Sequence, residues 1–207
     1  MVFIRDNVLY EGVLSTLFDS KPYLAPVGFI KDNDFVEMRI YKGTFLHEVL
    51  NKVNYVVINI THDPLMYFLS CFKEEVGNAV YHDYVFLDEK GVPRLINALG
   101  YIDLALLTKE NRDEYTLFRY RVKGIYDNDN YIRRVEPYTR CYSSIIEALI
   151  YLSKIRFMVR RDLNEAMKML DNFERSLEIA KKTCKNRQYS ELVERIKTVA
   201  RKWVRNY

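Results

Sequence analysis

The hydrophobic pattern divides the chain into a first part made of strand-like runs and a last part with helical spacing. In the first part, β-branched and aromatic residues fill the runs 8–18, 23–30 and 35–41, and turn-forming segments occupy 19–22 and 31–34. Runs of strand length separated by tight turns are typical of an antiparallel meander. The pattern therefore predicts three sequential antiparallel strands.

A short helix, a buried strand and a second short helix follow. Thr44 is a good N-cap residue, so residues 45–52 are expected to be helical. Residues 54–60 are almost uniformly apolar over the length of one strand, which predicts a central, buried strand. In Asp63-Pro64 the aspartate is placed to cap a helix and the proline to occupy its first position, which predicts a helix over 65–72.

The middle of the chain has a weaker pattern. Residues 79–87 and 99–107 are expected to be strands because they are rich in apolar residues. Residues 116–125 are the clearest period-2 segment in the sequence, with Leu117, Arg119, Arg121 and Lys123 alternating against Phe118, Tyr120 and Val122. The segment Asp127-Asn-Asp-Asn130 predicts a turn.

From residue 142 onward the apolar residues recur every three or four positions, which predicts amphipathic helices. Asp162 and Glu165 have the spacing of a capping box and predict the start of one of them. The expected architecture is α+β and rich in strands. We expect a β domain over residues 1–140, followed by a C-terminal helical extension over 141–207 that packs on it.

Charge is distributed unevenly along the 207 residues. The net charge is +4, but residues 1–150 hold 17 Lys+Arg and 21 Asp+Glu, whereas residues 151–207 hold 15 and 7. A basic helical segment is suited to nucleic acid. A solvated helix face, on which Glu174, Glu178, Glu191 and Glu194 pair with nearby cations, is the commoner explanation. We therefore do not expect a nucleic-acid partner.

Several classes are excluded by what the sequence lacks. It has seven scattered glycines and no glycine-rich phosphate loop or Gly-x-Ser-x-Gly motif. It has no apolar run of transmembrane length and no secretory signal, so we expect a cytoplasmic protein without a membrane partner. The three cysteines are odd in number and far apart, which favours reduced thiols. The three histidines do not have the spacing of zinc ligands, so no metal site is expected.

Three segments combine residues suited to binding a small molecule. Residues 39–44 bring two cations, a glycine and a hydroxyl to a strand-to-helix junction, where free N–H groups favour a phosphate. Asn59 and Thr61 lie on one face at the end of the buried strand, where they would bond the edge of a polar ring. The small residues of segment 25–28 would let a flat ring approach the backbone. An ordinary β-barrel with turn residues would also contain such features.

The order of these segments resembles the FMN-binding split-barrel proteins of flavin-reductase type, and within them a mainly archaeal family of uncharacterised flavin-binding proteins. The matching pieces end near residue 155, and they are Tyr10-Glu-Gly-Val-Leu-Ser-Thr16, Ala25-Pro-Val-Gly28, Tyr41-Lys-Gly-Thr44, Val57-Ile-Asn-Ile-Thr-His-Asp-Pro64, Leu95-Ile-Asn-Ala-Leu-Gly-Tyr101, Arg140 and Ile145-Ile-Glu-Ala-Leu-Ile150. The resemblance implies a six-stranded antiparallel split barrel that forms a homodimer and holds FMN in a groove at the dimer interface.

By the same resemblance, Lys42, Gly43 and Thr44 would hold the FMN phosphate, with Arg39 and either Ser15 or Thr16 as further candidates. The segment Ala25, Pro26, Val27 and Gly28 would lie behind the flavin ring. Asn59 and Thr61 would contact its edge or the ribityl chain. The implied function is that of an FMN-dependent oxidoreductase of unknown substrate.

Three positions leave an alternative open. After the Gly-Thr pair the family usually has polar residues, and this chain has Phe45, Leu46 and Val49 instead. A phosphate dianion needs several donors, each worth roughly 1.5–3 kcal/mol when charge-assisted. The alternative is therefore a split-barrel scaffold that has lost FMN and acts as a binding or assembly protein.

Overall fold

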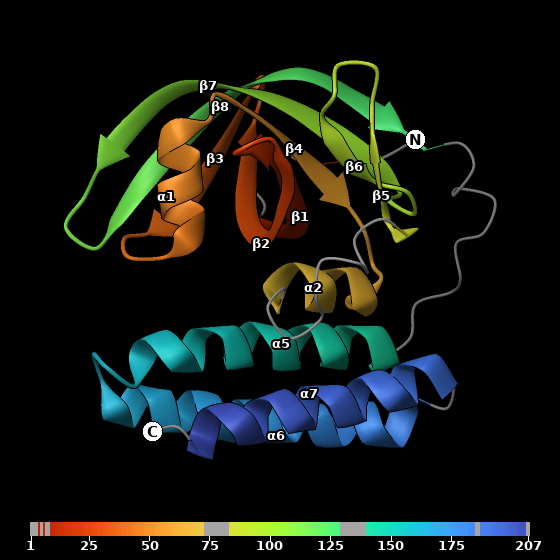
Figure 1. Ribbon diagram of the computed structural model, residues 1–207. Coiled ribbons are helices and arrows are strands. Elements are labelled where there is room, and N and C mark those ends of the chain that lie inside the picture. Colours follow the sequence, from red (N-terminus) through yellow and green to blue (C-terminus); the bar gives the residue numbers. More distant parts are fainter. Residues whose placement is uncertain are drawn as a thin grey trace. The chain divides into compact units, whose positions relative to one another are not determined.

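The computed structural model describes residues 4, 6, 9–72, 83–128, 140–184 and 187–205 (Figure 1). The chain divides into two compact units. The first unit comprises residues 1–61 and 77–135 and contains the described strands and α1 (Phe45–Lys52). The second comprises residues 62–76 and 136–207 and contains α2 (Pro64–Cys71), α5 (Arg140–Met158), α6 (Leu163–Thr183) and α7 (Arg187–Arg205).

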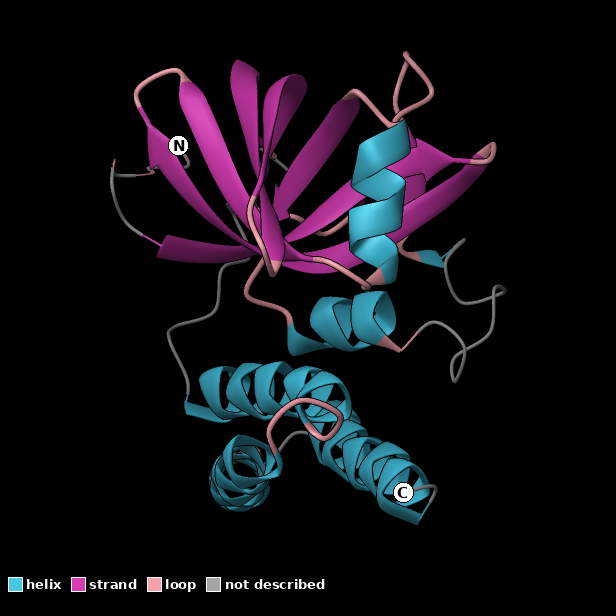
Figure 2. Cartoon of the chain, turned by 90° about the vertical axis from the view of Figure 1, so that its left-hand side faces the viewer, coloured by secondary structure: helices cyan, strands magenta, loops and turns pink. Residues whose placement is uncertain are grey.

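The first unit is a closed barrel of six strands, all paired antiparallel (Figure 2). Their order around the barrel is β1-β2-β3-β8-β7-β4, so β1 and β4 close the circle. The strands are β1 (Leu9–Phe18), β2 (Lys21–Asp32), β3 (Phe35–Tyr41), β4 (Tyr55–Ile60), β7 (Gly100–Asn111) and β8 (Tyr115–Asp127). The predicted α+β fold with a six-stranded antiparallel barrel is thereby confirmed.

Two local features of β1 explain how the barrel closes. The β1–β2 hairpin turns through Asp19 and Ser20, whose φ angles of 49° and 61° are those of the tight turn that suits the twist of paired strands. At the other end, β1 crosses β4 closely at Gly12. A Cβ atom on Gly12 would lie 2.7 Å from Cγ2 of Ile58, so a glycine is needed where the two strands meet.

The barrel interior is filled by apolar side chains from all six strands, and α1 adds to this core. Thr44 caps α1, because its hydroxyl oxygen accepts a hydrogen bond from the His47 N–H. Val49 and Leu50 of α1 are fully buried, and Leu50 belongs to the main core. The fully buried core residues with the largest side chains include Phe29, Met38, Ile58, Ile102, Phe118 and Tyr120.

A separate two-stranded hairpin belongs to the same unit. It consists of β5 (Val85–Leu87) and β6 (Pro93–Leu95), and β6 contacts both β1 and β4. Strand β5 lies in the segment 79–87 predicted as a strand, whose first four residues lie outside the described residues. Strand β6 was not predicted. The predicted turn at 127–130 is described only as far as residue 128.

The second unit consists of helices that bury apolar stripes against one another. Asp63 caps α2 as predicted, since its carboxylate accepts the Leu65 N–H at 2.9 Å and Pro64 occupies the first position. Asp162 caps α6 in the same way. The Phe72 ring lies 5.2 Å from that of Trp203, which joins the end of α2 to α7. None of the helices in the described ranges has an apolar stretch long enough to span a membrane.

The expectation of three reduced thiols was wrong. Cys141 and Cys184 form a disulfide with a Cα–Cα distance of 4.8 Å, whereas Cys71 is not part of a disulfide. The two cysteines are 43 residues apart, so their spacing gave no sign of a link. Helix α6 runs back along α5 and returns Cys184 to the first turn of α5, and this tertiary arrangement cannot be read from spacing alone.

Candidate functional site

The residues predicted to bind a ligand all lie in the barrel unit, where the structure divides them into three groups. One group is the junction between β3 and α1, a second lies where β1 meets β4, and the third is a segment of β2. Each group is held by different contacts, and only some of its members present groups that a ligand can reach.

The β3–α1 junction is a fixed turn. The Lys42 N–H donates to the Glu114 carbonyl at 2.9 Å, and Gly43 has a φ of 81°, in the left-handed region that glycine favours. The Thr44 hydroxyl donates to the Tyr41 carbonyl at 2.8 Å while it caps α1. The first N–H groups of a helix have no intrahelical acceptor, and the helix dipole makes this end electropositive. The junction therefore has the character of an anion site.

His47, in the first turn of α1, is partly buried and lies near two lysines. Burial lowers the pKa of His47, and the charges of Lys42 and Lys109 lower it further. The Thr116 hydroxyl donates to Asn111 at 2.8 Å and lies 2.9 Å from His47 Nε2, so Nε2 carries the proton of a neutral ring. Burial is the larger cause of the lowered pKa of His47, and the two lysines add positive charge that would stabilise an anion bound nearby.

Arg39 supplies a further cation near the end of β3. Its guanidinium lies 4.7 Å from the centre of the Tyr115 ring, and the side chain is exposed. Tyr115 pairs with Tyr41, the last residue of β3, so Arg39 is held on the strand that leads into the junction.

The second group centres on Asn59, which is fully buried and bonds three partners. Its amide nitrogen donates to the Val13 carbonyl and to the Ser15 hydroxyl, each at 2.8 Å, and its carbonyl oxygen accepts the Leu95 N–H at 2.8 Å. The Ser15 hydroxyl in turn donates to the Pro93 carbonyl. Asn59 and Ser15 therefore hold strand β6 against the outer face of β1 and β4.

The two threonines predicted for the site are also buried. The Thr16 hydroxyl donates to the Tyr55 carbonyl at 2.8 Å, which ties β1 to β4. Thr61 follows β4 and is 3% exposed. The structure thus uses Ser15, Thr16 and Asn59 for contacts between strands.

Only half of the small-residue segment of β2 faces outward. Ala25 lies opposite Leu14, a core residue, and Ala25 and Val27 are both buried. Pro26 and Gly28 point to the other face and are half-buried. Val13 lies directly opposite both Pro26 and Asn59, so Pro26 shares the outer face with Asn59 only two strands away.

The apolar residues that replace the polar family pattern have separate roles. Val49 is fully buried and packs with Tyr23 and Ala25, and Leu46 lies at the edge of the same cluster. Phe45 is 56% exposed, and its ring stands edge-on to Phe18 and Tyr23 at 5.7 and 5.6 Å. Phe45 is thus an exposed aromatic ring held beside the β3–α1 junction, whereas Val49 fills the core.

Sequence reasoning missed the strongest ion pair in the described part of the barrel. Arg94, on β6, donates to both oxygens of Asp103 at 2.8 and 3.0 Å and also bonds Asp88. The Tyr55 hydroxyl donates to the same Asp103 carboxylate at 2.7 Å. Arg94 and Asp103 are both buried. No sequence signal pointed to this pair, because the hairpin that carries Arg94 was itself only half predicted.

Within the described ranges, no group of three His, Cys, Asp or Glu side chains is placed to hold a metal ion. His62 is exposed, and His82 lies outside the described residues. His47 is committed to Thr116.

Comparison with solved structures defines the class of fold. The chain resembles an FMN-bound protein from Methanosarcina mazei, with a TM-score of 0.74, 20% identity, and coverage of 94% of this chain and 96% of the other. It also resembles an FMN-binding protein from Thermus thermophilus with bound p-hydroxybenzaldehyde, with a TM-score of 0.50, 19% identity, and coverage of 63% and 79%. A homologue of nitrilotriacetate monooxygenase component B from Mycobacterium thermoresistibile gives a TM-score of 0.51 at 13% identity, with coverage of 62% and 72%. The chain therefore has the fold of these proteins, two of which are described as FMN-bound or FMN-binding.

The family follows from the sequence. The N-terminal domain model of the protein family of unknown function DUF447 matches residues 10–127, more than half of the chain. The chain belongs to the DUF447 family, as does the Methanosarcina protein. No curated protein matches the chain in sequence.

Proposed function

We propose that this protein binds FMN and uses it in a flavin-dependent oxidation–reduction. The main support is the family: an FMN-bound DUF447 protein has the same fold over nearly the whole length of both chains. When bound, FMN would supply transfer of hydride or single electrons, and the protein would supply binding and orientation.

The β3–α1 junction fits the phosphate of FMN. Lys42 and Arg39 supply positive charge, and the first turn of α1 supplies main-chain N–H groups. Thr44 and Gly43 would shape the turn, because the Thr44 hydroxyl is already used by Tyr41 and His47. Lys42 and Lys109 also lie close enough to His47 to add to the lowering of its pKa that burial causes, which supports a positively charged environment at the junction.

The outer face of β2 fits a flat ring. Pro26 and Gly28 carry little side-chain bulk on that face, so a ring could approach the strand closely. Ser15 and Asn59 would act as positioning residues, because their hydrogen-bonding groups hold β6 in place. Ala25 and Val27 would support the strand from inside the barrel. We further propose a homodimer, whose second copy would complete the groove, in a cytoplasmic protein.

The direct test is a titration of the purified protein with FMN, followed by flavin absorbance and fluorescence. We expect saturable binding, and binding at least about tenfold weaker after Lys42→Glu, because a charge-assisted contact is lost. Lys123→Glu is the matched control, since Lys123 is an exposed lysine elsewhere on the barrel. A colourless protein that takes up no added FMN would contradict the proposal.

The His47 ring gives an independent readout of where the phosphate binds. A dianion at the junction should raise the pKa of His47, measured by NMR titration of the imidazole signals. Riboflavin lacks the phosphate and should leave that pKa unchanged. If FMN binds and the pKa of His47 does not move, the phosphate lies elsewhere.

A scaffold without FMN is the second candidate, and one observation favours it. The β6 strand covers Ser15 and Asn59, so part of the predicted ligand face is occupied by the chain itself. Under this alternative the protein would bind a partner through the barrel and show no flavin uptake. The same FMN titration separates the two functions.

A further inference from the structure

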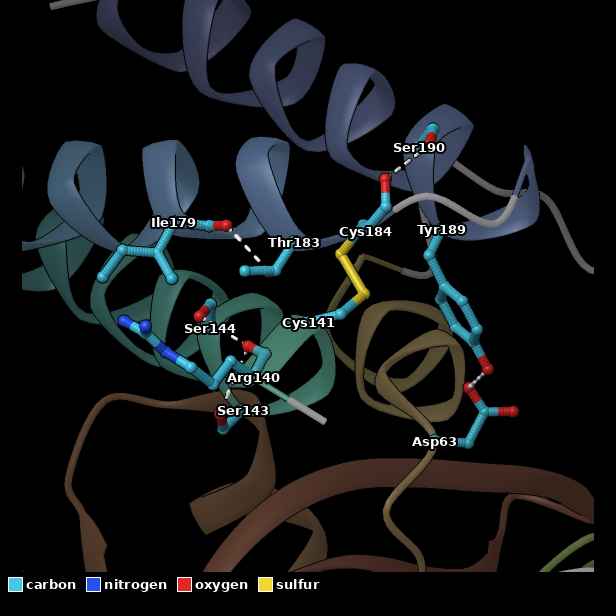
Figure 3. The surroundings of a disulfide bond; sticks show 10 residues. All are labelled: Asp63, Arg140, Cys141, Ser143, Ser144, Ile179, Thr183, Cys184, Tyr189 and Ser190. Carbon is cyan, nitrogen blue, oxygen red and sulfur yellow. Dashed lines mark hydrogen bonds between the residues drawn. A yellow bond between two sulfur atoms is a disulfide. The ribbon is translucent and has the colours of Figure 1, made fainter. Parts of the chain in front are cut away.

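The disulfide lies where three helices of the second unit come together (Figure 3). Cys141 is in the first turn of α5, and Cys184 is the C-cap of α6, whose N–H donates to the Ala180 carbonyl. Each cysteine is only 4% exposed. The bond thus fastens the start of one helix to the end of the next, immediately before α7 begins.

The first turn of α7 is attached to both cysteines through their neighbours. Tyr142 follows Cys141, and its ring lies 4.8 Å from the ring of Tyr189 on α7. On the other side, the Ser190 hydroxyl donates to the Cys184 carbonyl at 2.9 Å. Figure 3 shows Tyr189 and Ser190 next to each other at the start of α7, beside the disulfide. A displacement of the two cysteines would therefore also displace the first turn of α7.

Tyr189 connects the surroundings of the disulfide to α2. Its hydroxyl donates to the carboxylate of Asp63 at 3.4 Å, and the same oxygen of Asp63 accepts the Leu65 N–H that caps α2. Asp63 is largely shielded from water, and burial raises its pKa despite these two hydrogen bonds. A shielded carboxylate depends on each of its donors, so the Tyr189 hydroxyl contributes to the N-terminal cap of α2. Seven of the eight residues of α2 are buried.

We propose that the Cys141–Cys184 pair is a thiol–disulfide exchange site, whose oxidised form holds Tyr189 against Asp63 and thereby stabilises the docking of α2 and α7. The reactant is a small dithiol or a pair of monothiols. One thiolate attacks a sulfur of the pair and forms a mixed disulfide, and a second thiol displaces the cysteine. The two cysteines gain two electrons and two protons, and the reagent leaves as its own disulfide.

The burial of the pair determines how this site responds. Because both cysteines are almost inaccessible, a reductant reaches the sulfur atoms only when the packing around Cys141 and Cys184 opens locally. Once the pair is reduced, the link that closes a 43-residue separation is lost, and this local opening becomes more frequent. The redox state of Cys141 and Cys184 is therefore coupled to the stability of the helical unit.

The chain offers its own probe for the test. Trp203 is the only tryptophan, and its ring contacts Phe72 at the end of α2 and the Arg156 guanidinium of α5. Its fluorescence therefore reports the docking of α2 and α7. The full chain is compared as purified and after dithiothreitol, with thiols counted in denaturant and unfolding followed by Trp203 emission.

We expect one titratable thiol in the oxidised protein, that of Cys71, and three after reduction. Reduction should lower the midpoint of the Trp203 thermal transition by about 10 °C or more. Three thiols in the air-oxidised protein, or an unchanged midpoint after full reduction, would overturn the proposal. The double variant Cys141→Ser/Cys184→Ser should match the reduced protein. If that variant does not fold, the Trp203 midpoints of the unmodified chain before reduction, after reduction and after reoxidation decide between the outcomes.

Two tyrosine variants distinguish the proposed coupling between the disulfide and Asp63 from the general stabilisation that any cross-link gives. In Tyr189→Phe the bond to Asp63 is already absent, so reduction should lower the midpoint by clearly less than in the unmodified chain. Tyr151→Phe on α5 is the control, because Tyr151 is also half-buried and lies away from the disulfide. If both variants show the full shift, the disulfide is not coupled to Asp63 and the proposal fails.

Discussion

The two units of the chain use buried polar groups in opposite ways. In the barrel, such groups bond from one element to another: Thr16 reaches β4, Asn59 reaches β1 and β6, and Arg94 reaches Asp103 on β7. In the helical unit, the buried hydroxyls of Ser70 and Ser144 bond carbonyls of their own helices. Strand register in the barrel is therefore fixed by polar contacts at particular residues.

The helical unit must obtain its specificity from other contacts. Apolar stripes alone do not select one arrangement of the helices, because alternative arrangements can bury the same stripes at similar free energy. Long-range contacts that select one arrangement here are the disulfide, the Tyr189–Asp63 hydrogen bond and the Phe72–Trp203 contact. The comparison indicates that single polar substitutions should damage the barrel more than the helices.

The largest effect is expected from Arg94→Met in the barrel. This change leaves Asp103 as a buried carboxylate whose remaining described partner is the Tyr55 hydroxyl. Removing one partner of a buried pair typically costs about 3–5 kcal/mol. Urea unfolding followed by circular dichroism measures the loss in unfolding free energy.

A surface pair provides the control for Arg94. Lys52 and Glu48 lie 2.8 Å apart but are both more than half exposed, so Lys52→Met should cost no more than about 1 kcal/mol. Equal losses in the two variants would show that burial of the Arg94 pair is unimportant for stability.

A second, smaller effect compares one buried polar residue from each unit. Asn59→Ala leaves the Leu95 N–H and the Val13 carbonyl without their partner, which should cost about 2–3 kcal/mol. Ser70→Ala removes a hydroxyl whose hydrogen bond, among the described residues, lies within its own helix, and the loss should stay below about 1 kcal/mol. Hydrogen exchange of the Leu95 amide should accelerate in the first variant and stay unchanged in the second. If Ser70→Ala is the more damaging change, the contrast between the units is wrong.

The sequence predicted most of the fold because the decisive signals are local. Alternation over 116–125, the apolar run over 54–60 and the Asp63-Pro64 cap each act within a few residues, and the structure contains the corresponding strands and helix. Strand β6 escaped prediction because its three residues are held by Asn59 and Ser15 from distant parts of the chain. The disulfide escaped for the same reason.

The candidate site was predictable at the level of segments more than of side chains. The β3–α1 junction follows from a strand, a glycine and a cap residue in order, and the structure places Lys42, Gly43 and Thr44 at such a junction. Pattern alone could not show that the hydrogen-bonding groups of Asn59 are used by β6. Nor could it show that Ala25 and Val27 face inward, because that depends on the register of β2 against β1.

The smallest expected effect concerns two carboxylates, one in each unit, that respond to acid with opposite signs. Burial raises the pKa of Asp63 above its ordinary value of 3.8. Burial also acts to raise the pKa of Asp88, but hydrogen bonds from the Val92 and Lys90 N–H groups and from Arg94 outweigh it and hold that pKa below 3.8. Proton uptake therefore favours the folded form at Asp63 and opposes it at Asp88.

The pH windows follow from these directions. For Asp63, the stabilisation from proton uptake is complete below pH 3.8 and is lost as the pH rises through the folded-state pKa above that value. For Asp88, the stabilisation from the ionised form is complete above pH 3.8 and is lost as the pH falls through its lower folded-state pKa.

Three asparagine variants test these signs. Asp63→Asn keeps a good N-cap and removes the titration. On acidification this variant should therefore lack the gain in stability that the helical unit of the unmodified chain shows when unfolding is followed by Trp203 emission. Asp88→Asn should remove part of the acid-induced loss from the barrel, measured by circular dichroism over the same pH range. Asp171→Asn, at an exposed position of α6, is the control and should change neither curve. If Asp63→Asn and Asp88→Asn shift their curves in the same direction, the opposite signs assigned to these two carboxylates are wrong.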